Sequence, residues 1–297
     1  MDFYEDIRQF VLAELPHKPR DHAKLEAMHV RELLTLFFNW RDRSVPARPR
    51  TVYRSAVLSA NPLAADPQYK PGLDRIITLI ETGQELTPHL SSGINNVYQS
   101  KGPVQTSHLD LLLNDWGIHH LHLGTAIQKN GLVKRTGPLL FAVFGRDDVY
   151  LIDIMKHGKW ADDAVIRTIV QEWPDAGIVN QLKGFTGLGA PVSEHQRMSL
   201  REAHLMGLVE IDGAVYAPAK MLTTAGTSSQ HVEAADEVLR RVRVFEEHLK
   251  NSPDYITTTL TQYGVTPPPT PDLHFAFFSE ETYGIVERHT DVGFSLT

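Results

Sequence analysis

From about residue 118 to residue 155 the spacing of apolar residues is that of strands, whereas before residue 118 it is that of helices. No other feature of the sequence limits the possible folds as much. Residues 118–123, 139–144 and 149–155 have the pattern of strands, and residues 145–148 separate the last two as a hairpin turn. Helical patterns precede and follow these strands without a regular strand–helix–strand alternation. The sequence therefore predicts an α+β fold. It has a helical N-terminal region, a small antiparallel sheet core over 118–155 with flanking helices, and a second α+β part.

Apolar residues at helical spacing, together with capping residues, predict the helices. The predicted helices cover residues 3–15, 22–40, 72–84, 106–115, 162–173 and 230–250. Residues 41–54, which contain five arginines, and residues 60–71 are expected to be connections. A boundary at about 177–190 is expected to separate a histidine-bearing domain, residues 1–176, from an acidic accessory part, residues 191–297.

Composition excludes several classes of protein. The chain of 297 residues has no cysteine, so a disulfide scaffold, a thiol nucleophile and a thiolate zinc site are excluded. No run approaches the roughly 18–20 apolar residues of a membrane helix, and the acidic first residues lack a secretory pattern. We therefore expect a cytoplasmic protein that does not span a membrane.

Charge is uneven along the sequence. The formal net charge of −7 argues against a protein that coats nucleic acid. Residues 117–160, however, contain six Lys or Arg against three Asp or Glu, a local net charge of +3. A basic segment inside an acidic protein is typical of a site that holds one anionic substrate.

The segment 116–124, WGIHHLHLG, places three histidines in one predicted strand. Because side chains alternate along a strand, His120 and His122 share one face, whereas His119 and two leucines share the other. If the leucines face the core, the His120 and His122 pair faces solvent or a cleft.

Two histidines at this spacing suit two chemistries. In metal-independent ribonucleases one imidazole takes the proton of the 2′-hydroxyl group and another protonates the leaving oxygen, and His120, His122 and His157 are the candidates. Alternatively, the two imidazoles hold a divalent metal together with Asp153 and His157. Asp153 interrupts an apolar strand, so this carboxylate is expected to have a partner.

The exit from the last strand of the hairpin, KHGKW at 156–160, combines cations with an aromatic residue. Lys159 is a candidate for binding phosphate, and Trp160 for stacking on a base. Trp160 alternatively covers the start of the next helix.

The basic stretch and the hairpin LLFAVF-GRDD-VYLIDIMKHG resemble the sheet of the RelE/ParE toxin superfamily over about residues 118–159. The resemblance implies an endoribonuclease, with His157 and Lys159 at the exit and Arg135 leading into the hairpin. The larger body of this chain would then bind a protein partner such as an antitoxin. Two features depart from the family: residues 136–138 separate Arg135 from the strand, and the chain is large and acidic. The wider pattern is also similar to that of an uncharacterised bacterial protein family, which implies no activity.

Three functions follow as predictions. The first is an endoribonuclease that needs no cofactor and acts on RNA or the ribosome, with Arg135 and Lys159 holding the phosphate. The second is a metal-dependent phosphoesterase with the four ligands named above. The third is a non-enzymatic interaction or scaffold protein in which the histidines are structural.

Overall fold

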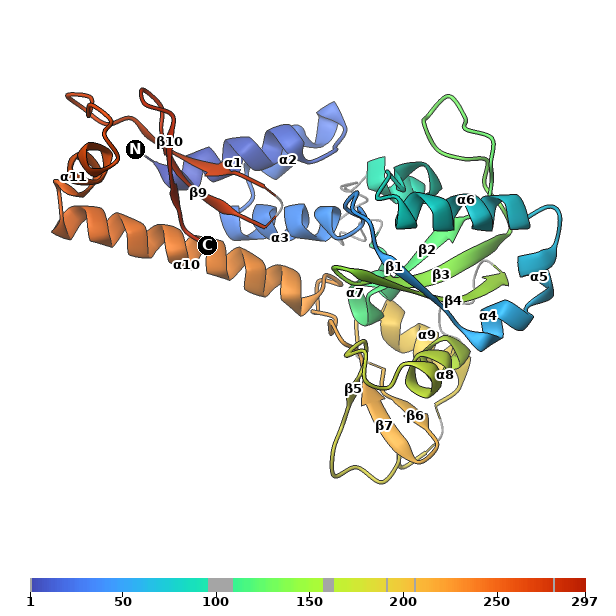
Figure 1. Cartoon of the computed structure of the whole chain (residues 1–297). Coiled ribbons are helices and arrows are strands. Elements are labelled where there is room, and N and C mark those ends of the chain that lie inside the picture. Colours follow the sequence, from blue (N-terminus) through green and yellow to red (C-terminus); the bar gives the residue numbers. More distant parts are fainter. Residues whose placement is uncertain (1, 96–108, 157–162, 191, 206, 280) are drawn as a thin grey trace. The chain divides into compact units, whose positions relative to one another are not determined.

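The computed structural model has an α+β fold, in which helices flank three small sheets (Figure 1). This confirms the fold class predicted from the sequence. Among the described residues, no helix is long and apolar enough to cross a membrane. The residues that the structure describes are 2–95, 109–156, 163–190, 192–205, 207–279 and 281–297.

The elements are numbered along the chain. The helices are α1 (Phe3–Glu14), α2 (His22–Glu26), α3 (Val30–Arg41), α4 (Ala56–Ala60), α5 (Pro62–Ala65), α6 (Lys70–Glu81), α7 (Leu111–Trp116), α8 (Asp163–Glu172), α9 (Glu194–Glu202), α10 (Ser229–Asn251) and α11 (Tyr255–Gln262). The strands are β1 (Thr51–Arg54), β2 (Ile118–His122), β3 (Pro138–Phe144), β4 (Asp148–Lys156), β5 (Asn180–Gln181), β6 (Val209–Ile211), β7 (Ala214–Ala217), β8 (Leu273–Phe277), β9 (Tyr283–Glu287) and β10 (Val292–Ser295).

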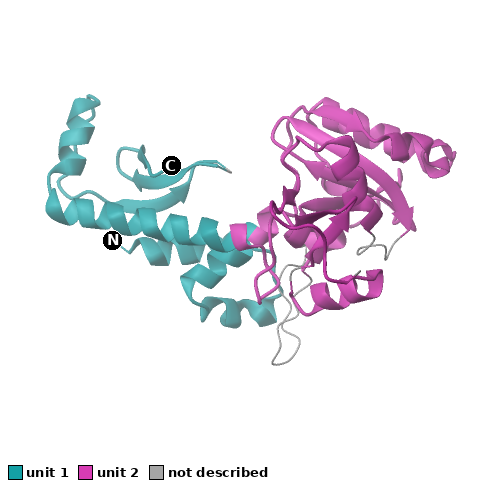
Figure 2. Cartoon of the chain, turned by 90° about the horizontal axis from the view of Figure 1, so that it is seen from below, with its two compact units in different colours: residues 1–38, 231–297 teal, residues 39–230 magenta. Residues whose placement is uncertain are grey.

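The chain forms two compact units, drawn in teal and magenta in Figure 2. Unit 1 comprises residues 1–38 and 231–297, and unit 2 comprises residues 39–230. The division falls inside α3 and α10. The boundary predicted at 177–190 lies within unit 2, and independent folding on either side of it stays a prediction.

Unit 2 is built around a four-stranded sheet in the order β1-β4-β3-β2. β3 and β4 form the predicted hairpin, β2 pairs antiparallel with β3, and β1 pairs in parallel with β4. A register shift in the hairpin places Phe141 opposite Asp153 but Ala142 opposite Leu151. The extra residue of this β-bulge is Ile152, directly before Asp153, and the bulge bends β4 there.

Apolar clusters cover both faces of this sheet. Leu121, Leu140 and Leu151 pack with residues of α4 and α6 on one face. Ile118 and Phe141 pack with residues of α7, α8 and β6 on the other. Strands buried on both faces have nearly continuous apolar sequences, which is the pattern of β3 and β4.

The two covered faces change the expectation for β2. Phe141, opposite His120, and Leu139, opposite His122, both belong to the cluster under α7 and α8. The histidine pair therefore does not share one open face. The His120 side chain keeps 12% exposure, whereas His122 is only 3% exposed.

A second sheet of unit 2, in the order β5-β7-β6, contains the hairpin β6–β7. Its turn residues Asp212 and Gly213 have φ angles of 52° and 79°. Positive φ at both central residues is the signature of the type I′ turn that the Asp-Gly dipeptide predicts.

Unit 1 combines the antiparallel sheet β10-β9-β8 with α1, α2, α11 and most of α3 and α10. Asp6 of α1 links helix to sheet, because its carboxylate accepts hydrogen bonds from the His274 ring and from the Phe275 backbone. The rings of Phe10, Phe37 and Phe277 pack together between these elements.

One predicted helix is divided in the structure. Residues 22–40 form α2 and α3 instead of a single helix. The Arg8 guanidinium donates hydrogen bonds to the carbonyl oxygens of Glu26 and Met28. A continuous helix would need these oxygens for its own hydrogen bonds, so the contact favours the break.

The two expected connections also contain regular structure. Residues 51–54 form β1, and α5 lies within the expected loop 60–71. The short helices α4 and α5 begin at side-chain caps, where Ser55 accepts from the Leu58 backbone and Asn61 from the Leu63 backbone. Caps and tertiary contacts, not helical periodicity, stabilise such short helices.

Candidate functional site

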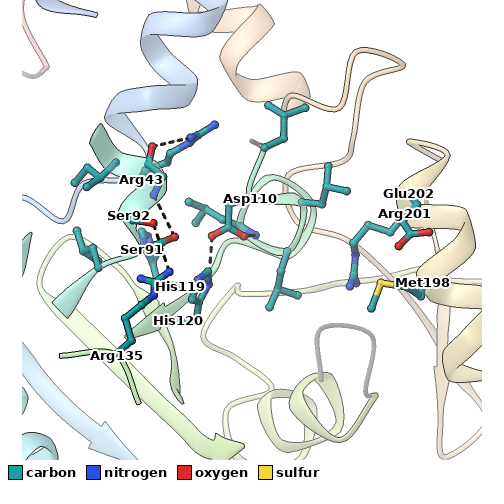
Figure 3. A pocket seen from close by; sticks show the side chains of 17 residues that line it. Arg43, Ser91, Ser92, Asp110, His119, His120, Arg135, Met198, Arg201 and Glu202 are labelled. Carbon is teal, nitrogen blue, oxygen red and sulfur yellow. Dashed lines mark hydrogen bonds and ion pairs between the residues drawn. The ribbon is translucent and has the colours of Figure 1, made fainter. Parts of the chain in front are cut away.

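A cavity of about 530 Å³ opens in unit 2 beside β2 and α7 (Figure 3). It contains two of the predicted site residues, His120 and Arg135. On the right in Figure 3, α9 contributes Arg201 and Glu202. The lining residues are 43, 90–94, 109–113, 119, 120, 135, 198, 201 and 202.

Asp110 and His120 form the central pair of the cavity. The Asp110 carboxylate caps α7, since Oδ1 accepts a hydrogen bond of 3.1 Å from the Leu113 backbone. Its second oxygen, Oδ2, lies 3.2 Å from Nδ1 of His120. α7 ends at Gly117, whose φ of 71° turns the chain directly into β2. A capping residue and a C-terminal glycine thus bring the carboxylate to the imidazole.

Two arginines reach the cavity from different elements. Arg135 lies on the connection between β2 and β3, and its guanidinium donates to the Ser92 hydroxyl over 3.4 Å. Arg43 is 6% exposed and donates to the Asn39 side chain and to the Gly93 carbonyl oxygen. Burial lowers the pKa of Arg43, and the nearby carboxylate of Asp110 acts in the opposite direction.

A third guanidinium, that of Arg201, is held by a buried carboxylate. Nε of Arg201 lies 3.3 Å from Oδ2 of Asp115, and both side chains are almost completely buried. Burial raises the pKa of Asp115 to about 6, although Arg201 and Trp116 lower it. An ionisable group with a raised pKa beside a cavity is typical of functional sites.

His119 also lines the cavity, but its ring is enclosed. It is 8% exposed and contacts the edge of the Phe144 ring, with the centroids 5.2 Å apart. Burial lowers the pKa of His119 to about 4, and Asp42 and Asp110 act against this shift. The imidazole is therefore neutral near pH 7, which makes it a poor proton donor.

The other predicted residues do not join His120 and Arg135. His122 does not line the cavity, and its carbonyl oxygen accepts a hydrogen bond from Nδ1 of His89. Asp153 has a partner, as its place in an apolar strand led us to expect. Among the described residues, the partner is not a histidine or a metal site: the Asn61 side-chain amide donates a hydrogen bond of 2.6 Å to the Asp153 carboxylate. Since Asn61 caps α5, Asp153 orders the chain between α4 and α5.

Three predicted residues, His157, Lys159 and Trp160, lie outside the described residues. Among the residues that are described, no three His, Asp or Glu side chains gather closely enough to hold a metal ion. Of the predicted metal ligands that are described, Asp153 contacts Asn61 and His120 lies beside Asp110.

Sequence reasoning missed Asp110, Arg43 and Arg201. For Asp110 a local signal existed, because an aspartate before LLLNDWG is a helix cap placed one short helix before the histidine strand. For Arg43 the arginine-rich stretch 41–54 was a partial signal. Arg201 had none, because α9 meets α7 only through tertiary contacts.

Comparisons of the chain with protein-family models, with curated proteins and with solved structures found no match. Function must therefore be inferred from the chemistry of the cavity. An imidazole with an orienting carboxylate can transfer a proton, and guanidinium groups beside it can bind a phosphate or a carboxylate.

Proposed function

We propose that the cavity of unit 2 binds RNA and cleaves it by acid–base chemistry that needs no metal, with His120 as the base. One observation carries the proposal: the imidazole of His120 lies beside the Asp110 carboxylate in a cavity that Arg135 also lines. In the proposed arrangement the carboxylate, whose Oδ2 lies 3.2 Å from Nδ1, orients the ring and favours the tautomer with the proton on Nδ1, which leaves Nε2 as the proton acceptor.

In the proposed reaction the 2′-hydroxyl proton passes to His120 while O2′ forms a bond to phosphorus. The bond between phosphorus and O5′ breaks, and O5′ receives a proton. Arg135 offsets the negative charge on the phosphoryl oxygens by charge-assisted hydrogen bonds. His157 remains the predicted proton donor, and Lys159 and Trp160 remain predicted RNA contacts.

The proposal narrows the set of residues predicted from the sequence. It does not use His122, whose ring lies outside the cavity lining, or Asp153, which contacts Asn61. RNA, alone or in the ribosome, is the proposed partner, and the cytoplasm is the proposed location.

The test compares His120→Gln with His195→Gln, a matched change at an exposed histidine of α9. Cleavage of an end-labelled single-stranded RNA should fall about 1000-fold in the first variant, within the range for lost acid–base catalysis, and should be unchanged in the second. Both variants should keep the melting temperature of the unchanged protein. Equal cleavage by His120→Gln would show that another group is the base.

The same assay with a chelator separates the alternatives. Cleavage should survive EDTA, whereas loss with EDTA and recovery with Zn²⁺ or Mn²⁺ would support the metal-dependent phosphoesterase. RNA left intact by the unchanged protein would contradict the proposal and favour the interaction protein.

A further inference from the structure

The connection between β2 and β3 forms a basic arm, residues 124–136, beside the cavity. Its two segments are joined by backbone hydrogen bonds from Lys134 to Ala126, at 2.7 Å, and from Gln128 to Leu132, at 2.8 Å. In Figure 1 the arm is the green loop that extends beyond α6. These bonds give the arm a defined hairpin-like shape.

Buried residues fix the returning segment of the basic arm. Leu132 and Val133 are 5% and 1% exposed, and the Val133 backbone donates to the carbonyl oxygen of Pro88. The Leu123 backbone donates to the hydroxyl group of Thr136. Charges on such a support lose little further freedom on binding, which favours affinity.

The exposed side chains of the basic arm carry charge of one sign. Lys129 lies in the turn, Lys134 lies on the returning segment, and Arg135 follows at the cavity; all three are exposed. Arg75 of α6, also exposed, donates to the carbonyl oxygen of Thr125. No Asp or Glu occurs from residue 116 to residue 146, although the whole chain has a net charge of −7.

We propose that the basic arm binds the phosphate backbone of single-stranded RNA next to the nucleotide held in the cavity. The choice of RNA rests on the proposed function. The cations run from the turn of the arm to Arg135, so one strand that enters the cavity continues along Lys134 and Lys129. A cavity of about 530 Å³ admits an unpaired nucleotide and excludes a duplex. Lysines contact phosphates as point charges and read no base.

The test measures binding of a fluorescent 2′-O-methyl RNA oligonucleotide by anisotropy. This probe has no 2′-hydroxyl group, so binding is measured without cleavage. Removing one lysine that binds a phosphate of a single strand lowers the slope of log affinity against log salt by about 0.7. The double variant Lys129→Gln/Lys134→Gln should therefore have a slope smaller by about 1.4 and bind about 20-fold more weakly at 0.1 M salt.

A matched variant, Lys183→Gln/Lys250→Gln, removes the same charge at exposed positions that do not belong to the basic arm. It should bind as tightly as the unchanged protein. An equal decrease of affinity in both variants, or no decrease in the first, would overturn the proposal. Competition by polyglutamate as strong as by RNA of equal charge would also overturn it, since the arm would then bind any acidic polymer.

The two proposals fail in different measurements. If the unchanged protein leaves RNA intact but binding depends on Lys129 and Lys134, the proposed function is wrong and the binding surface holds. If cleavage depends on His120 but binding ignores both lysines, only the assignment of the basic arm is wrong.

Discussion

Each unit of the molecule buries a carboxylate almost completely, and the pKa values of the two carboxyl groups are shifted in opposite directions. Glu287 in unit 1 is 0% exposed and Asp115 in unit 2 is 1% exposed. Burial alone would raise the pKa of Glu287, but hydrogen bonds from Asp272, His289 and Thr290 lower it to about 2. Burial raises the pKa of Asp115 to about 6 against the pull of Arg201 and Trp116.

The difference follows from the donors that each carboxylate receives. Glu287 accepts hydrogen bonds from the backbone of Asp272, from the ring of His289, and from both the backbone and the hydroxyl group of Thr290. Asp115 has a guanidinium at 3.3 Å as its ion-pair partner. Burial disfavours a charge unless hydrogen bonds replace the lost water. Glu287 therefore keeps its charge to a lower pH than Asp115 does.

The largest expected effect is at Glu287. Glu287→Gln places an amide N–H₂ where donors now point, so the free energy of unfolding at pH 7 should fall by about 3 kcal/mol in urea titrations. Glu233→Gln, at an exposed position of α10, should change it by less than about 0.5 kcal/mol. Because the pKa of Glu287 is lowered, its contribution is complete above the unfolded value and is lost as the pH falls towards 2. Similar stability of both variants would contradict this assignment.

The second effect is the pH dependence caused by Asp115. Its folded pKa lies above its unfolded value of 3.8, so the folded state holds the proton more tightly and stability falls as the pH rises through about 4 to 6. Asp115→Asn removes this pH dependence. The stability of the variant relative to the unchanged protein should therefore rise by about 2 kcal/mol between pH 4 and pH 7. Asp175→Asn, exposed in unit 2, should show no such trend. If the free energy of unfolding varied with pH in the same way for Asp115→Asn and for the unchanged protein, Asp115 would not be the source of this pH dependence.

The third effect is at Asp110. Its side chain is 19% exposed, so it is more accessible to solvent than Glu287 or Asp115. Asp110→Asn keeps a good helix cap but removes the carboxylate that orients His120 in the proposed function. RNA cleavage should fall about 100-fold, or about 2.7 kcal/mol in the barrier, with an altered pH–rate profile and little change in melting temperature. Recovery of most activity by Asp110→Glu would support a positioning role. Unchanged kinetics in Asp110→Asn would exclude it.

Local pattern was sufficient for several elements. The hairpin β3–β4, the type I′ turn at Asp212 and Gly213, and the long helix α10 follow from period and turn chemistry alone. The strand β1 could not be found this way, because residues 51–54 become a strand only by pairing with β4, which lies far away in sequence. The break between α2 and α3 could not be predicted for the same reason. It is favoured by hydrogen bonds from Arg8, which is distant in sequence, to the carbonyl oxygens of Glu26 and Met28.

The candidate site, too, could be predicted from the sequence only in part. Two residues singled out from the sequence, His120 and Arg135, line the cavity, but so does His119, which strand alternation had placed on the opposite face. Which histidine would reach a cavity depended on α7 and α8, which cover the face that His120 and His122 share. Asp153 was expected to have a partner and has one, but its identity, Asn61, depends on where α5 begins.

By itself, the order of the residues determined the long helix α10, the β3–β4 hairpin, the Asp-Gly turn and the segment where positive charge is concentrated, because these depend on neighbours a few positions away. Only the tertiary structure decided which polar groups are buried together, which carboxylate receives enough donors and which imidazole borders a cavity. Burial and pairing set the energy of a charge, and both depend on residues that are distant in the chain.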